Sequence, residues 1–502
     1  MSMTSMSASI STNRPYSKYV SLVFMLAYVG VLVFINEIDS YDEIDNESYD
    51  EDSLQQLRGL KDGKNALTGH KYTSIFVDPP PLFPLTSRTI LGFTLSVFGL
   101  LLAAGGGIGG GGILVPLYTL VLSFTPKHAI PLSNITVFGG SLANFILNSS
   151  KRHPLADRPL VDWDLILVME PVTILGALIG AIVNKLLNDV VLAILLVVLL
   201  TLTANNSLKK AIKMYKKETK EIEKRKKQRD IELAKIAKEQ EEGLLQSEST
   251  SLLPNPAPET LDPELLTILT SESTISLQKV TSLTALFICI LILNVLKGGG
   301  YYSPLGIHCG SPGWWFSNLL MFLLITLFML NVRTTLIKKY HTKQRLNFKY
   351  VPGDIQWSER NTIVYPLICT VAGGVAGMFG VGGGIVKGPL MLAMNVHPKV
   401  SGATSATMIL YTSFTATTSF FVFGLVVKDY AVVCFFLGFI ATWVGQVGMT
   451  KLMEGNERNS YIAFSIGGVV AVSAVMMGVQ SIISLAEGKT GGGGGGGGGI
   501  CG

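Results

Sequence analysis

The sequence predicts an all-α, polytopic membrane protein with about 11–13 membrane-embedded helices. Three observations predict this fold class. Hydrophobic residues make up 48% of the 502 residues and charged residues only 15%, against about 25% charged residues in ordinary globular domains. The mean hydropathy is +0.44. Apolar runs recur along the whole chain, and glycine clusters interrupt two of them. This composition argues against a soluble enzyme, a disordered protein and a nucleic-acid binder.

Nine apolar runs are long enough to cross a hydrocarbon core of about 30 Å, which needs roughly 20 helical residues. They are 18–36, 130–148, 164–185, 188–205, 281–297, 314–332, 401–425, 430–450 and 460–484. Two further apolar regions, 89–124 and 362–396, are each split by glycines into two pieces, and three of these four pieces are too short to cross comfortably. The nine runs and the four pieces give 13 membrane-embedded elements.

Lys and Arg collect in particular loops and predict the orientation. Residues 209–229 hold 11 Lys and Arg against three acids, and residues 333–360 hold seven against two. Residues 37–52 hold nine acids and no base. Because basic loops stay in the cytosol, we expect a cytosolic N-terminus and an external C-terminus in a plasma membrane or an endomembrane.

These patterns divide the chain into eight segments. They are an N-terminal anchor or signal segment (1–36), an acidic extracytosolic segment (37–88), a first transmembrane repeat (89–205), a charged cytosolic loop with a Ser/Pro-rich linker (206–280), a connecting transmembrane hairpin (281–332), a basic cytosolic loop (333–361), a second transmembrane repeat (362–484) and a Gly-rich tail (485–502).

Two short motifs lie in these segments. Asn46 begins a glycosylation sequon on the expected outer side, unless the triplet is unused. Residues Glu248 to Leu253 fit an acidic dileucine pattern for trafficking adaptors, and the alternative is a plain linker.

The two glycine clusters are similar to each other. GIGGGGILVP (107–116) aligns without a gap with GVGGGIVKGP (380–389), and five of ten positions are identical. Further along, Pro126-Lys127 matches Pro398-Lys399, and Leu132-Ser133 matches Thr404-Ser405. Seven membrane elements separate the clusters. An odd number reverses the direction of the second copy, so we expect two inverted repeats with glycine-broken helices.

Paired glycine-broken segments at matching positions are typical of a transporter's substrate site. An unwound stretch leaves backbone groups free inside the bilayer, and a helix N-terminus after the break attracts anions. The alternative is that the glycines only allow tight helix packing. The candidate substrate-binding residues are Gly107, Gly109, Gly110, Gly111, Pro116, Ser133 and Asn134 in the first repeat, and Gly380, Gly382, Gly383, Gly384, Lys387, Pro389, Thr404 and Ser405 in the second.

Two ionisable residues lie at expected membrane depth, where charge is costly and usually functional. Glu170 is the candidate proton-coupling residue, unless it lies near the cytosolic interface and is hydrated. Lys387 follows the second glycine cluster and is a candidate to attract an anion, unless its side chain snorkels to the surface. We predict no metal site and no cofactor, because His308 and Cys309 have no third ligand nearby in the sequence.

The motifs GIGGGGILVP, GVGGGIVKGP and PKVSGATSATM resemble the sulfite exporter TauE/SafE family of membrane transporters, in particular its eukaryotic branch. The tracts EPVTILGALIGA (170–181) and ATWVGQVGMTKL (441–452) are similar to later helices of that family. The resemblance covers roughly 89–215 and 362–484. It implies transport of sulfur-containing anions such as sulfite and sulfonates, and no enzymatic activity.

The sequence therefore predicts a secondary transporter of small anions that works by alternating access, with the lipid bilayer and a small anion as its partners and no nucleic acid. No Walker motif is present, so we do not expect ATP hydrolysis. The alternative is a membrane scaffold that recruits cytosolic partners through the 207–280 loop. The oligomeric state stays open.

Overall fold

The computed structural model describes residues 82–486, except 108, 125, 187–188, 243–262, 298–306, 308–309, 380–383, 423–425 and 454–457. These residues form thirteen α-helices. The first seven are α3 (Ser87–Ala104), α4 (Gly111–Leu120), α5 (Pro126–Ser149), α6 (Trp163–Leu186), α7 (Asp189–Glu242), α8 (Pro263–Ser273) and α9 (Leu277–Lys297). The others are α10 (Pro312–Arg345), α11 (Asn361–Phe379), α12 (Gly384–Ala393), α13 (Pro398–Val422), α14 (Lys428–Met453) and α15 (Ser460–Ala486).

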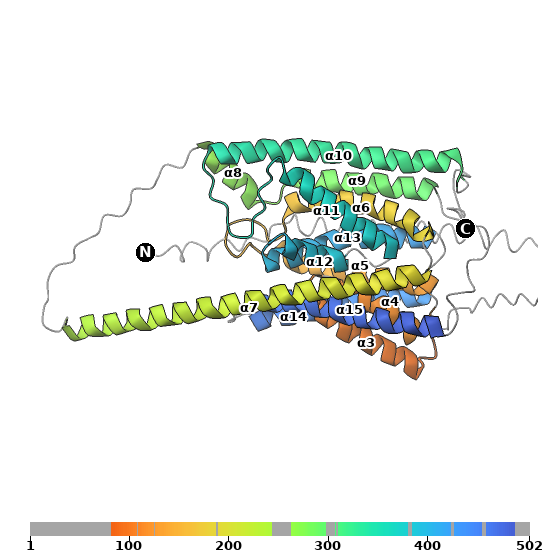
Figure 1. The fold of residues 1–502 in the computed structure, drawn as a ribbon, viewed down its shortest axis with the longest axis horizontal. Coiled ribbons are helices and arrows are strands. Elements are labelled where there is room, and N and C mark those ends of the chain that lie inside the picture. The colour runs from red at the N-terminus through yellow and green to blue at the C-terminus, as the bar shows by residue number, and fades with distance from the viewer. Residues whose placement is uncertain are drawn as a thin grey trace, which may run out of the picture.

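Most helices lie roughly side by side in one bundle, with α10 along one edge and α3 along the other (Figure 1). Within the bundle, α6 packs on α11, α14 packs on α3 and α5, and α7 packs on α15. The hairpin of α9 and α10 packs against α6. Large apolar side chains of α10, such as Leu319, Leu323 and Leu327, are exposed on the outside of the bundle, as expected for a face in contact with lipid.

Seven of the described helices are long and apolar enough to cross a membrane, judged by length and composition: α3, α5, α6, α9, α10, α14 and α15. The shorter apolar helices include α4 and the first sixteen residues of α11. The all-helical prediction is confirmed over the described residues. The expected first span, 18–36, lies outside them, as do Asn46 and the dileucine pattern.

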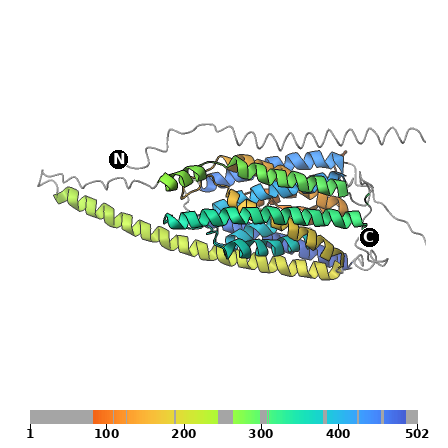
Figure 2. The same cartoon turned by 90° about the horizontal axis from the view of Figure 1, so that it is seen from above.

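Two helices continue past the boundaries that the sequence analysis gave them. The expected span 188–205 and the first part of the charged loop 206–280 form one helix, α7, because no Gly or Pro interrupts the 54 residues from Asp189 to Glu242. At 1.5 Å per residue this helix is about 80 Å long, and it projects beyond the bundle (Figures 1 and 2). Similarly, α10 continues 13 residues past the expected span 314–332 into the basic loop.

The basic stretches lie at one end of the bundle, which we call the basic end. It comprises loops 150–162 and 346–360, α8, and the part of α7 after residue 206 (Figure 1). Arg345 of α10 binds Glu264 of α8 through both carboxylate oxygens at 2.7 and 2.8 Å. Glu218 of α7 accepts the backbone N–H groups of Asn459 and Ser460 at the start of α15. The basic end is therefore a connected layer and not a set of separate loops.

Glycines allow two helix pairs to pack with their backbones in contact. A Cβ on Gly438 of α14 would overlap the carbonyl oxygen of Thr136 in α5, and a Cβ on Gly139 of α5 would overlap that of Phe435 in α14. Between α6 and α11, a Cβ on Gly176 would overlap the carbonyl oxygen of Thr370. Because a backbone carbonyl cannot move aside as a side-chain end can, these helices require glycine at the contacts.

We predict that Gly438→Ala destabilises the protein by about 1–3 kcal/mol, the usual cost of overpacking. Helix propensity alone would favour Ala by roughly 1 kcal/mol. The free-energy cost of the overlap between the new Cβ and the Thr136 carbonyl must therefore exceed that gain. Gly448→Ala in the same helix is the matched control, because a Cβ at Gly448 meets nothing within 4 Å. Thermal unfolding in detergent measures both variants. A Gly438→Ala protein as stable as Gly448→Ala would contradict the backbone contact.

Candidate functional site

The first glycine cluster is a break between two helices. Helix α3 ends at Ala104 and α4 begins at Gly111. Gly107, Gly109 and Gly110 have φ values of +64°, +77° and +70°, in the left-handed region that strongly favours glycine. Gly110 is the N-cap of α4 and has no side chain to close the cap. The sequence therefore breaks the helix at the expected position because successive residues adopt backbone angles that other residues resist.

The break lies against the start of α13. A Cβ on Gly107 would overlap the carbonyl oxygen of Gly402, and a Cβ on Gly109 would lie 3.0 Å from Val137. Gly105, Gly106, Gly107 and Gly110 are all buried. Unpaired backbone groups are tolerated at membrane depth only where protein or a water-filled cavity surrounds them. Helices α5 and α13 provide that surrounding.

The second cluster also separates two helices, because α11 ends at Phe379 and α12 begins at Gly384. Gly380, Gly382 and Gly383 lie outside the described residues. Pro389 is the sixth residue of the ten-residue α12, as Pro116 is of the ten-residue α4, and both prolines are buried. A proline at this depth in a helix removes one backbone hydrogen bond, so both short helices share the same local weakness.

The predicted hydroxyl and amide groups occupy different environments. The Ser133 hydroxyl donates to the carbonyl of Gly111 at 3.4 Å, which joins α5 to the first residue of α4. Asn134 donates to its own helix at Ile130. Thr404 accepts the backbone N–H of Asp162 at 3.1 Å, so its hydroxyl contacts the loop before α6. Ser405 is fully buried, and its oxygen has no hydrogen-bond partner among the described residues. Ser133 is therefore the predicted hydroxyl that contacts the first break, and Ser405 is the one whose oxygen has no partner among the described residues.

Glu170 and Lys387 form a buried ion pair. The Lys387 ammonium on α12 lies 2.5 Å from Oε2 of Glu170 on α6. Lys387 is 2% exposed and Glu170 is 0% exposed. The lysine therefore does not snorkel to the surface, and the glutamate is not hydrated at an interface. The second carboxylate oxygen, Oε1, has no partner among the described residues. Two residues predicted to act separately are thus in direct contact.

A cavity of about 190 Å³ connects the first break with the basic end. Its walls come from the end of α3, the ends of α5 and α14, and the starts of α13 and α15. The lining residues include Gly105, Gly107, Asn148, Lys151, Lys399, Gly402, Gln446 and Thr450. The volume is far above the roughly 10–15 Å³ that one water needs. The cavity brings Gly107 together with cations that the sequence analysis did not select, whereas Lys387 is not part of its wall.

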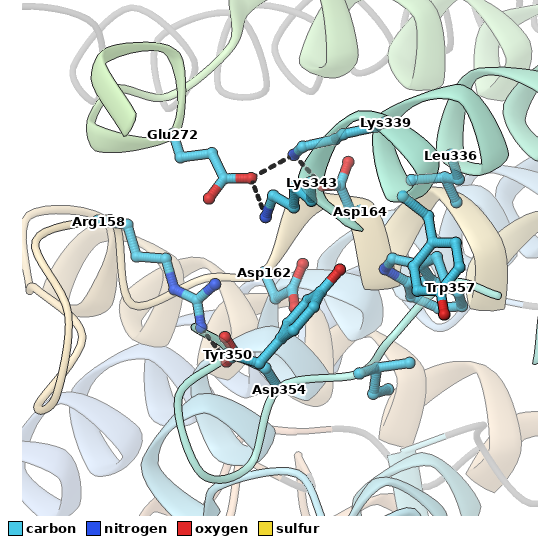
Figure 3. A pocket seen from close by; sticks show the side chains of 12 residues that line it. Arg158, Asp162, Asp164, Glu272, Leu336, Lys339, Lys343, Tyr350, Asp354 and Trp357 are labelled. Atoms are coloured by element: carbon cyan, nitrogen blue, oxygen red, sulfur yellow. Dashed lines mark hydrogen bonds and ion pairs between the residues drawn. The ribbon is translucent and has the colours of Figure 1, made fainter. Parts of the chain in front are cut away.

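A second, smaller pocket lies at the basic end next to loop 150–162, and a network of charges lines it (Figure 3). Arg158 of loop 150–162 is bound to Asp354 of loop 346–360. Burial of the Arg158 side chain lowers its pKa, but the carboxylate of Asp354 acts in the opposite direction, and the pKa of Arg158 is raised above its ordinary value. Nearby, Lys339 and Lys343 of α10 each lie 2.6 Å from Glu272 of α8. These contacts tie α8 and α10 to the loop that carries Lys151.

Sequence reasoning missed Lys151 and Lys399 as site residues. Lys399 belongs to the Pro-Lys pair that recurs after both glycine clusters. This repetition is the sequence feature that could have identified Lys399 as a candidate site residue. Lys151 lies in a short basic loop that the sequence analysis used only for orientation. No local pattern links Lys151 to a glycine break 44 residues earlier in the chain.

Comparison with known proteins gives one consistent result. The family model "Sulfite exporter TauE/SafE" matches residues 91–237 and 280–477. Sulfite exporter TauE/SafE family protein 3 of Arabidopsis thaliana is 27% identical over 81% of this chain and 81% of its own length. Family protein 2 of the same plant is 28% identical over 79% and 84%, and family protein 6 is 22% identical over 91% and 94%. No solved structure matches the chain significantly.

The matched residues include α3 to α6, the first 49 residues of α7, and nearly all of α9 to α15. They contain both glycine breaks, the buried ion pair and the cavity. The unmatched residues 238–279 comprise the end of α7, α8 and the segment between them. This chain is a multi-pass integral membrane protein that belongs to the sulfite exporter TauE/SafE family of transporters.

Proposed function

We propose that the chain is a secondary transporter of small, sulfur-containing anions such as sulfite or sulfonates, and that the anion binds in the 190 Å³ cavity. The observation that carries this proposal is that the cavity ends at the first glycine break, where Gly105 and Gly107 form part of its wall. On its other side the cavity meets the N-terminus of α13 at Lys399 and Gly402, and the partial positive charge there can replace part of an anion's hydration. The family name and the names of the plant relatives supply the sulfur-anion class.

Alternating access between two inverted repeats is the mechanism that we propose. The repeats are α3 to α7 and α11 to α15. Two related contacts support this pairing. Gly445 of α14 packs on Leu101 of α3, and Gly176 of α6 packs on Gly374 of α11. In the gap-free alignment of the two glycine clusters, Leu101 corresponds to Gly374. A two-fold relation between the repeats would exchange the pair α3 and α14 with the pair α11 and α6.

The basic end is the cytosolic side in this proposal, because Lys and Arg collect there. Loop 150–162, loop 346–360 and the projecting part of α7 then face the cytosol, and the cavity opens toward it. The N-terminus is cytosolic and the C-terminus external, in a plasma membrane or an endomembrane. Glycosylation at Asn46 and adaptor binding at residues 248–253 remain predictions from the sequence.

The Glu170–Lys387 pair is our proposed coupling element. A proton on Glu170 cancels the charge that holds Lys387, and the freed ammonium then adds a full positive charge beside the second break. Helix α13 connects the part of α12 near Lys387 with the cavity. Gly388, which follows Lys387 in α12, accepts a hydrogen bond from Ser401 of α13 at 3.4 Å. Gly402, which follows Ser401, lines the cavity. Movement of α12 would therefore be transmitted directly to the cavity wall.

We predict that Gly110→Leu abolishes anion flux while the protein still inserts in the membrane. Leucine at φ +70° costs about 1–2 kcal/mol and favours the continuous helix that the site needs broken. Flux of labelled sulfite into proteoliposomes, normalised to the inserted protein, measures the effect. Gly448→Ala is the control. Full flux in Gly110→Leu would mean that the cluster only packs helices.

For the ion pair, we predict that Lys387→Met uncouples anion flux from a pH gradient, because Lys387 bonds Glu170 and does not line the cavity that holds the anion. Glu170→Gln should remove the dependence of flux on a pH gradient. Each single change leaves a buried group without its partner and should lower stability by about 3–5 kcal/mol. The double variant Glu170→Gln/Lys387→Met should regain most of the stability but not the coupling. Coupled transport by the double variant would contradict this role.

The scaffold alternative has one observation in its favour. Residues 220–234 of α7 are almost all exposed and project away from the bundle (Figure 2). Deletion of residues 226–260 separates the two functions, because it spares α8 and its bonds to α10. A transporter keeps its anion flux after this deletion. A scaffold shows no anion flux before the deletion and loses its cellular role after it.

A further inference from the structure

Two lysines share the cavity although they come from different halves of the chain. Lys151 follows the end of α5, and Lys399 is the second residue of α13. Both side chains are half-buried and line the cavity beside Gly105 and Gly107. No carboxylate is among the described residues that line it. The cavity therefore holds two positive charges without a matching negative charge from its own described wall.

Lys151 is fixed in position by α14. Its ammonium donates a hydrogen bond of 3.2 Å to the hydroxyl of Thr450. That hydroxyl is itself oriented, because it donates to the carbonyl of Gln446 at 2.8 Å. An ammonium has three N–H donors, so two remain for a ligand. Burial and the positive charge of Lys399 both lower the pKa of Lys151, and both residues line the same cavity.

Lys399 lies in the first turn of α13. Its backbone N–H donates to Nδ1 of His397 at 3.3 Å, which closes part of the helix N-terminus. No hydrogen bond or ion pair involves the Lys399 ammonium in the part of the chain that the structure describes. Gly402 and Ala403, one turn further along, also line the cavity. The partial positive charge of the α13 N-terminus thus adds to the charges of the two lysines.

Several other cations of the basic end are paired with carboxylates. Arg158 is bound to Asp354, Lys279 lies 2.5 Å from Asp164, and Lys339 lies between Asp164 at 3.0 Å and Glu272 at 2.6 Å. Deeper in the bundle, Lys387 is paired with Glu170. The fold thus neutralises these cations with carboxylates brought from other helices. Lys151 and Lys399 differ, because no carboxylate is among the described residues that line their cavity.

We propose that Lys151 and Lys399 form a two-cation receptor for a divalent oxyanion and make the protein prefer divalent over monovalent anions of the same shape. This inference rests on the proposed anion transport and adds the charge class of the substrate. Two ammonium groups without counter-charge repel each other, and a dianion between them removes that repulsion at both sites. A monoanion of equal size neutralises only one of the two charges, so it gains less from the same cavity.

The test compares two tetrahedral sulfur anions, sulfate with two charges and methanesulfonate with one. Binding of each anion to the purified full-length protein in detergent is measured by calorimetry at low ionic strength, because salt screens charges that are partly exposed. Flux of each labelled anion into proteoliposomes is measured in parallel. The variants are Lys151→Met, Lys399→Met and the double variant. Lys210→Met is the matched control, because Lys210 is a basic-end lysine that bonds Asn395 outside the cavity.

The unaltered protein should bind sulfate more tightly than methanesulfonate. Each single lysine variant should weaken sulfate binding roughly tenfold or more, as expected for the loss of one charged hydrogen bond, and should weaken methanesulfonate binding less. The double variant should no longer distinguish the two anions. Lys210→Met should behave like the unaltered protein. Thermal unfolding of each variant shows whether the cavity has remained folded.

Two results would overturn the inference, and they differ in what else they overturn. If the unaltered protein transports anions and the folded lysine variants keep its preference for sulfate, the receptor role is wrong and the proposed transport stands. If the unaltered protein neither binds nor transports any of the tested anions, including sulfite, the proposed function and the receptor role fall together.

Discussion

Unpaired backbone groups cannot be left in contact with lipid, and this constraint governs the architecture around the first glycine break. Between Ala104 and Gly111 the regular helix is interrupted, although the N–H groups of Gly106 and Gly107 still bond the carbonyls of Ala103 and Ala104. In the bilayer such a segment is tolerated only inside protein or beside water. The structure meets the constraint by placing Gly107 in backbone contact with Gly402 and by opening a cavity at the same point. The protein contact and the cavity therefore both keep the backbone of the break away from lipid.

The glycines within the helices have a different purpose from the glycines of the break. Gly438, Gly139 and Gly176 lie in regular helix, where glycine is less favourable than alanine by roughly 0.5–1 kcal/mol. Their backbones touch carbonyl groups of the neighbouring helix, and close approach of this kind is how helices associate where lipid gives no hydrophobic driving force. A high glycine content thus has two physical origins in this chain, and the breaks account for only part of it.

Charge is treated in three ways in the same bundle. At the basic end, cations such as Lys339 meet carboxylates from other elements in a half-solvated network. In the core, Glu170 and Lys387 compensate each other, because an isolated buried charge would cost several kcal/mol. In the cavity, Lys151 and Lys399 have no carboxylate among the described lining residues. This third arrangement leaves positive charge available to a ligand without first breaking an ion pair.

The sequence by itself determined the helices, the position of the break at Gly107–Gly110 and the separate segments on either side of residues 380–383. Hydropathy, glycine and proline act over one or two helical turns, so a window of about 20 residues contains the information. The same reasoning underestimated α7 and α10, because polar residues continue a helix when no glycine or proline ends it. Glu170 and Lys387 were also identified as buried candidates from their apolar neighbours alone.

Tertiary structure alone decided what those residues meet. Glu170 and Lys387 are 217 residues apart in the chain, and Lys151 and Thr450 are 299 apart. Whether a lysine binds an anion or a glutamate depends on which group lies within about 4 Å, since a Coulomb interaction weakens with distance and with exposure to water. Helix packing sets that neighbour, and no local pattern of the sequence records it. The backbone contacts of the glycines made Lys151 and Lys399 neighbours, and their location in one cavity turns two ordinary basic residues into a candidate binding site.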